Sequence, residues 1–180
     1  DNSPSVLILP TYFFDFVQEA QDYYLPPITG IYLRCIRIGV FFATLLVTPF
    51  WFYFNSNPHL APSWLSFAII EDSGNLPIIV QLLILEFGID ALKLASLNTP
   101  SSLNSSFSII GALILGDFAV NAGWFAPEVI LYMAFVALAN FTQPSYELGY
   151  GVKFMRVMML ILIALLPSYG LWIGLVLMAL

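Results

Sequence analysis

The sequence predicts an all-α fold in a membrane: a polytopic integral membrane helical bundle with broken or re-entrant helices. Two observations lead to this fold class. Of the 180 residues, 60% are hydrophobic and only 9% are charged, whereas a soluble domain carries about 25% charged residues. The apolar residues also occur in long runs, and a chain this short cannot bury so much apolar surface within itself. Lipid is therefore expected to surround most of the chain.

The chain divides into two parts. Residues 1–29 mix acids, aromatic residues and prolines, which is typical of a juxtamembrane segment with tyrosines at headgroup depth. Residues 30–180 are expected to form the transmembrane domain. Five apolar runs predict its membrane segments: Ile31–Phe54, Pro77–Leu97, Phe107–Gly123, Pro127–Gln143 and Val152–Leu180. A full crossing needs about 20 apolar residues, so the shorter runs either cross or re-enter. The last run is expected to be one bent span or two half-helices.

The basic residues predict an orientation for these segments. With the N-terminus in the cytoplasm and five alternating crossings, all 5 basic residues lie toward the cytoplasmic face, in agreement with the positive-inside rule. Lys93 ends the second segment on this side. The other four are expected to anchor the topology: Arg34, Arg37, Lys153 and Arg156.

Three charged residues lie within the apolar stretch "LILEFGIDALKLA" of the second segment: Glu86, Asp90 and Lys93. Their i, i+4 and i, i+3 spacings place them on one face of a helix. An ionised group at the bilayer centre costs about 2.5–3.5 kcal/mol on insertion scales, so this face must contact protein, water or headgroups. Asp90 and Lys93 are expected to form a structural charge pair, which leaves Glu86 as a net negative charge.

A further acid, Asp117, lies in "LILGDFAVNAG", with Asn121 four residues later. Rings of acidic side chains around a symmetry axis line many cation pores. The candidates for such a polar path are Glu86, Asp90, Asp117 and Asn121. In the alternative interpretation the carboxylates hold helices together and never contact an ion. The sequence leaves both interpretations open.

No catalytic or metal-binding constellation is predicted. Cys35 is the sole cysteine of the sequence, which excludes an internal disulfide framework and a multi-cysteine metal site. The serines of residues 101–108 lack a G-x-S-x-G elbow, and His59 is the sole histidine, in a proline-rich loop. We therefore expect no enzyme activity and no cofactor. The net charge of −6 and the absence of a basic arm disfavour a nucleic-acid partner.

Four stretches of the chain resemble the membrane domain of the spore germination receptor A-subunit (GerA-type) family. They are "QDYYLPPITGIYLRCIRIGVF", "GNLPIIVQLLILEFGIDALKLASLNTPSSL", "IIGALILGDFAVNAGWFAPEVILY" and "TQPSYELGYGVKFMR", and the similarity covers roughly residues 15–165 in the family's order. The resemblance places Glu86, Asp90 and Asp117 at the family's best-matched polar positions. Arg37 corresponds to its basic residue before the first span.

The resemblance implies a multi-pass protein in the inner membrane of the endospore that acts early in germination. It further implies a homo-oligomer whose subunits build a channel for monovalent cations and work beside other germination membrane proteins. An alternative function is a non-conducting membrane scaffold that clusters germination receptor proteins. Family members carry a large N-terminal cytoplasmic domain, so residues 1–29 are expected to be the end of such a domain, the rest of which is missing from this chain.

Overall fold

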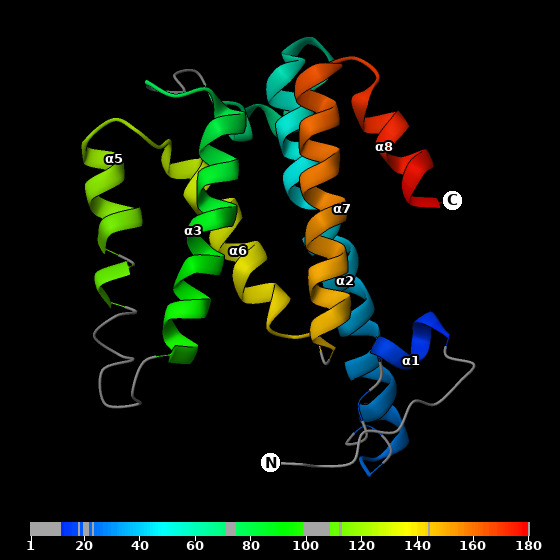
Figure 1. Cartoon of the computed structure of the whole chain (residues 1–180). Coiled ribbons are helices and arrows are strands. Elements are labelled where there is room, and N and C mark those ends of the chain that lie inside the picture. Colours follow the sequence, from blue (N-terminus) through cyan, green and yellow to red (C-terminus); the bar gives the residue numbers. More distant parts are fainter. Residues whose placement is uncertain are drawn as a thin grey trace.

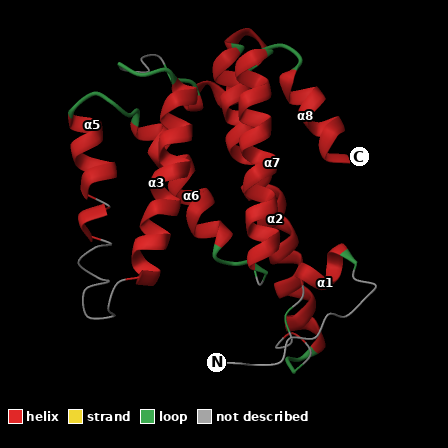
Figure 2. Ribbon diagram, viewed as in Figure 1, coloured by secondary structure: helices red, strands yellow, loops and turns green. Residues whose placement is uncertain are grey.

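The computed structural model describes residues 12–17, 19, 22, 24–70, 75–98, 109–111, 113–143 and 145–179. Every regular element in these ranges is helical (Figure 2), which confirms the predicted all-α class. The first half contains α1 (Phe13–Val17), α2 (Pro27–Ser56), two 3-10 turns (Pro58–Leu60 and Ser63–Ala68) and α3 (Ile78–Asn98). The second half contains a π-helical turn (Ile114–Phe118), α5 (Ala119–Asn121), α6 (Pro127–Asn140), α7 (Tyr146–Leu165) and α8 (Gly170–Ala179).

Four helices form the bundle. Helix α2 packs against α6 and α7, and α3 packs against the same two helices from another side (Figure 1). Their shared apolar core is contributed by all four helices. Its most buried members include Trp51, Leu82, Leu85, Val129, Met133, Met159, Leu160 and Ile163.

Helix α2 is the longest helix among the described residues, and its sequence explains where it begins. Pro27 occupies the first turn, where the missing N–H of proline leaves no hydrogen bond unmade. Beyond its C-terminal end, side chains of α2 hold the following loop in place. Trp51 Nε1 donates to the Ala68 carbonyl at 2.7 Å, and Asn55 Oδ1 accepts from the Ile70 amide at 2.8 Å.

The stretch from Ile109 to Asn121 forms a shorter apolar helical element at the edge of the bundle, beyond α3 (Figure 1). Its middle, Ile114–Phe118, is π-helical, and α5 is its last turn. The element ends at Asn121, and in the turn that follows Gly123 adopts a positive φ of 70°. The Gly123 carbonyl accepts a hydrogen bond from the Asn75 amide at 3.1 Å, so the turn is tied to the start of α3.

The last apolar run is two helices rather than one bent span. Helix α7 ends at Leu165 and α8 begins at Gly170, with Pro167 between them. The Pro167 carbonyl accepts a hydrogen bond from Asn57 Nδ2 at 2.7 Å, so the break is held by the end of α2. From this turn α8 packs back on α7 (Figure 1).

Within the described residues, two helices are long and apolar enough to cross a bilayer, α2 and the Glu147–Leu165 part of α7. Helix α3 has 21 residues but carries three charges. Helix α6 has 14 residues and is only about 21 Å long at 1.5 Å per residue, less than the roughly 30 Å of a hydrocarbon core. The structure therefore supports fewer complete spans than the five apolar runs predict.

Candidate functional site

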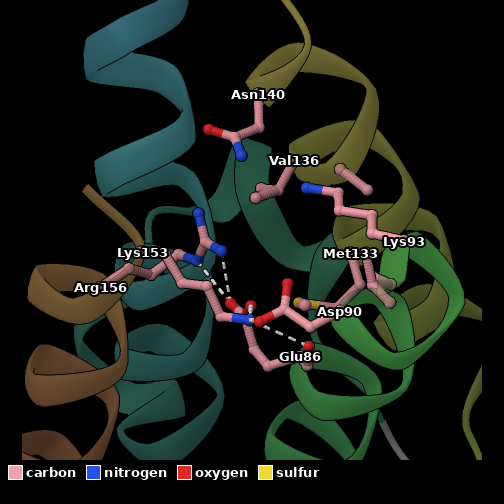
Figure 3. A pocket seen from close by; sticks show the side chains of 10 residues that line it. Glu86, Asp90, Lys93, Met133, Val136, Asn140, Lys153 and Arg156 are labelled. Atoms are coloured by element: carbon pink, nitrogen blue, oxygen red, sulfur yellow. Dashed lines mark hydrogen bonds and ion pairs between the residues drawn. The ribbon is translucent and has the colours of Figure 1, made fainter. Parts of the chain in front are cut away.

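The charged face of α3 points into the bundle and meets α7 there (Figure 3). Glu86 is only 5% exposed and Arg156 only 4%. Two nitrogens of the Arg156 guanidinium, Nε and Nη2, reach Glu86 Oε1 at 2.6 and 2.5 Å. The third, Nη1, donates to the Thr44 carbonyl at 3.0 Å. One buried ion pair therefore connects α2, α3 and α7.

Lys153 extends this contact by one turn. Its Nζ donates to the Glu86 backbone carbonyl at 3.1 Å and to the Asp90 carboxylate, and it lies 3.6 Å from Glu86 Oε2. Two acids and two bases thus form a neutral cluster, which we call the α3–α7 charge cluster: Glu86, Asp90, Lys153 and Arg156. Buried charges need such compensation, because an unpaired one is strongly destabilising. In this arrangement the carboxylates of Glu86 and Asp90 both form ion pairs with basic side chains.

Asp90 has a different partner from the one predicted by sequence spacing. The structure pairs it with Lys153 on α7, whereas Lys93 directs its ammonium over the Phe141 ring, 5.0 Å from the centroid. Figure 3 shows the Lys93 side chain extending away from the α3–α7 charge cluster, toward the side of Asn140. The i, i+3 spacing fixed a shared helix face correctly, but a cation from the neighbouring helix reaches the carboxylate instead.

Asp117 and Asn121 lie apart from this cluster, on the outer helical element. Both are exposed, and they line a shallow hollow of about 320 Å³ together with Gly116, Val120 and Pro127. No ion pair to Asp117 forms among the residues that the structure describes. The π-helical turn that carries Asp117 is a rare conformation that often occurs at functional sites. The four candidate polar-path residues are therefore divided between two places.

Ion pairs divide three of the four predicted topology anchors between two places. Lys153 and Arg156 belong to the α3–α7 charge cluster, so they serve an internal contact. Arg37 binds the segment before α2: its Nη2 lies 2.7 Å from Glu19 Oε2, and its Nη1 pairs with Asp22. Burial raises the pKa of Asp22, but hydrogen bonds from the Glu19 amide and from Arg37 outweigh it and hold this pKa below its usual value.

Two polar contacts of the bundle carried no signal in the sequence. The Thr44 carbonyl is a backbone group, so its use by Arg156 depends only on helix packing. Gln81 is completely buried; its Nε2 donates to the Leu76 carbonyl at 2.7 Å and its Oε1 accepts from the Ala126 amide at 2.9 Å. Within the described ranges, no group of three or more His, Cys, Asp or Glu side chains is placed to hold a metal ion.

Comparison with known proteins places the chain in a family. The family model described as Bacillus/Clostridium GerA spore germination protein matches residues 1–180. The chain belongs to the GerA family. Stage V sporulation protein AF of Bacillus subtilis (strain 168) is 40% identical over 174 residues, which are 97% of this chain and 35% of that protein. This identity agrees with the family resemblance that the "EFGIDALKLA" and "PSYEL" motifs indicate.

Two further GerA relatives are less identical to the chain. Spore germination protein KA of the same organism is 31% identical over 182 residues, 99% of this chain and 33% of that protein. Spore germination protein A1 is 29% identical over 173 residues, 94% of this chain and 36% of that protein. The chain thus spans about a third of the length of these relatives. No solved structure matches it.

Proposed function

We propose that the chain is the multi-pass membrane part of a spore germination protein in the inner membrane of the endospore. Its relatives carry names of spore germination and sporulation proteins, which supports the role. The surface of the bundle supports the location. Large apolar side chains are exposed on several helices, among them Phe87 (77%), Phe154 (70%), Leu165 (72%) and Trp172 (62%). Soluble monomers rarely expose such extensive apolar surface.

We further propose that this GerA protein forms a homo-oligomer that conducts monovalent cations during germination. The observation that carries this proposal is the exposed carboxylate of Asp117 on an otherwise apolar helical element. Facing lipid, an ionised carboxylate costs several kcal/mol. Around a symmetry axis, copies of Asp117 and the neighbouring Asn121 would instead face a shared aqueous path, where acidic rings attract cations.

The α3–α7 charge cluster has a different task in this proposal. Its carboxylates are paired, so Glu86 and Asp90 offer no uncompensated charge to a passing ion. They hold α3 against α7 and keep the bundle rigid, while the outer element carries the polar path. Other germination membrane proteins are the expected partners of the assembly.

The experiment is cation flux through proteoliposomes that contain the full-length protein. Asp117→Asn is expected to lower K⁺ flux at least severalfold, because it removes the charge that attracts cations without changing side-chain size. Asp15→Asn on α1 makes the same chemical change outside the bundle and is expected to leave flux unchanged. Equal flux in Asp117→Asn and wild type would remove Asp117 from the path. No flux from the wild-type protein would favour the non-conducting scaffold.

A further inference from the structure

A second polar cavity lies where α3 ends and α6 turns into α7. It measures about 270 Å³, and its lining residues are Lys93, Asn140, Phe141, Gln143, Ser145, Gly149 and Tyr150. Lys93 and Asn140 also border the small hollow above the α3–α7 charge cluster (Figure 3). The cavity therefore adjoins that hollow, at the opposite end of α3 from the Gln81 contact.

Amide groups without partners line this cavity. Asn140 Oδ1, Gln143 Oε1 and Gln143 Nε2 are buried, and none of them has a hydrogen-bond partner among the described residues. A buried polar atom left unsatisfied costs about 1–3 kcal/mol, and most proteins avoid it. Three such atoms around one cavity indicate a ligand that offers both hydrogen-bond donors and acceptors.

The charge of the cavity is positive. Lys93 lines it, and among the described residues its ammonium has no ion-pair partner. Residues 94–113 contain no Asp or Glu in the sequence, and Asp90 is held by Lys153. The acid that follows the cavity, Glu147, is exposed, accepts from Ser145 Oγ at 2.9 Å and does not line the cavity. The ligand is therefore expected to carry negative charge.

The shape of the cavity fits a headgroup at a membrane surface. A Cβ at Gly149 would lie 3.2 Å from Asn140 Oδ1, so the glycine leaves room for the amide. Phe141 is 70% exposed and Tyr150 44%, and aromatic side chains of this kind gather at the membrane–water interface. The volume is below the roughly 300–1,000 Å³ of pockets for drug-sized ligands, so a small headgroup fits better than a large solute.

We propose that this cavity binds the phosphoglycerol group of an anionic lipid, phosphatidylglycerol being the simplest example. The phosphodiester oxygens accept hydrogen bonds from Lys93 Nζ and Gln143 Nε2. The glycerol hydroxyls donate to Asn140 Oδ1 and Gln143 Oε1. Phosphocholine offers no donor for these two oxygens, and phosphoethanolamine brings a second ammonium near Lys93. The inference rests on the membrane location proposed above and is independent of ion conduction.

Lipid retention by the full-length protein in detergent tests this site. Native mass spectrometry after addition of phosphatidylglycerol or phosphatidylcholine gives the bound fraction of each lipid. We expect preferential retention of phosphatidylglycerol, about tenfold weaker in Lys93→Gln and in Gln143→Leu, since a hydrogen bond to a charged group contributes roughly this factor or more. Lys93→Arg is expected to retain most of the binding. Arg34→Gln removes one positive charge from α2 and is the matched control, with unchanged retention.

A stability measurement separates binding from folding. The side-chain amide of Gln143 has no hydrogen-bond partner within the described part of the protein, so Gln143→Leu is expected to leave Tm without lipid unchanged or higher. Equal phosphatidylglycerol retention in Lys93→Gln, Gln143→Leu and wild type overturns the proposal. If the protein binds free glycerol phosphate but shows no preference between the two lipids, the claim that the ligand is a lipid headgroup is overturned. Cation flux is measured separately, so loss of flux in Asp117→Asn with normal lipid retention supports both proposals.

Discussion

Arg156 reaches the Glu86 carboxylate with two of its guanidinium nitrogens and the Thr44 carbonyl with the third. All three groups lie deep in the bundle, on three different helices. Arginine suits this position because its donors form a rigid planar fork and its charge is permanent. The contact fixes how α2, α3 and α7 pack, and it makes the packing sensitive to the charge of a single carboxyl group.

Glu86→Gln is expected to lower the free energy of unfolding by about 3–5 kcal/mol, because it leaves the buried Arg156 charge without its counter-charge. The measurement is equilibrium unfolding in detergent micelles. Glu128→Gln makes the same chemical change on α6, where no ion pair to a described residue forms, and is expected to stay within about 0.5 kcal/mol of wild type. Equal stability of the two variants would contradict a structural role for the Glu86–Arg156 pair.

Spacing along the chain predicted part of this site. The i, i+4 separation of Glu86 and Asp90 placed both on one helix face, and both do meet α7. The positive-inside rule placed Lys153 and Arg156 on the same side of the membrane as Lys93, yet it could not show that they point inward. Contacts between residues more than 60 positions apart depend on helix packing, for which one sequence carries no direct signal.

Helix positions were more predictable than their packing. The second and fourth apolar runs agree with α3 (Ile78–Asn98) and α6 (Pro127–Asn140) to within a few residues, because proline and polar breaks bound them. The π-helical turn at Asp117 and the unpartnered amides of Asn140 and Gln143 could not be predicted. Both features arise from tertiary geometry rather than from composition or periodicity.

Gly170→Ala is expected to destabilise the turn between α7 and α8 by about 1–3 kcal/mol, the usual cost of overpacking. A Cβ at Gly170 would overlap the Leu162 carbonyl of α7, and backbone atoms cannot move aside as a flexible side chain can. Gly151→Ala is the control, because nothing lies within 4 Å of a Cβ there. It is expected to stabilise α7 by about 0.5–1 kcal/mol. Tm values of the two variants should therefore shift in opposite directions.

The Asp22–Arg37 pair is expected to make stability depend on pH in the acidic range. The pKa of Asp22 is lowered in the folded protein, so its contribution is complete above the unfolded pKa and is lost as pH falls through the folded pKa. The Tm difference between wild type and Asp22→Asn should be complete at pH 6 and should shrink as the pH falls below the unfolded pKa of about 3.9. Arg37→Gln removes the partner and should abolish most of this difference. A Tm difference that stays constant over the whole range would contradict the ion pair.

Gln81→Met is expected to destabilise the junction between the start of α3 and the start of α6. The variant keeps the length of the side chain but leaves the Leu76 carbonyl and the Ala126 amide without the bonds they form at 2.7 and 2.9 Å. Each orphaned buried group costs about 1–3 kcal/mol, so the free energy of unfolding should fall by at least that amount. Val80→Met, at the neighbouring and 37% exposed position, introduces the same side chain without breaking a hydrogen bond and should be nearly neutral. Similar unfolding curves for both variants would mean that water replaces Gln81 at the helix ends, and that the junction is more open than the complete burial of Gln81 indicates.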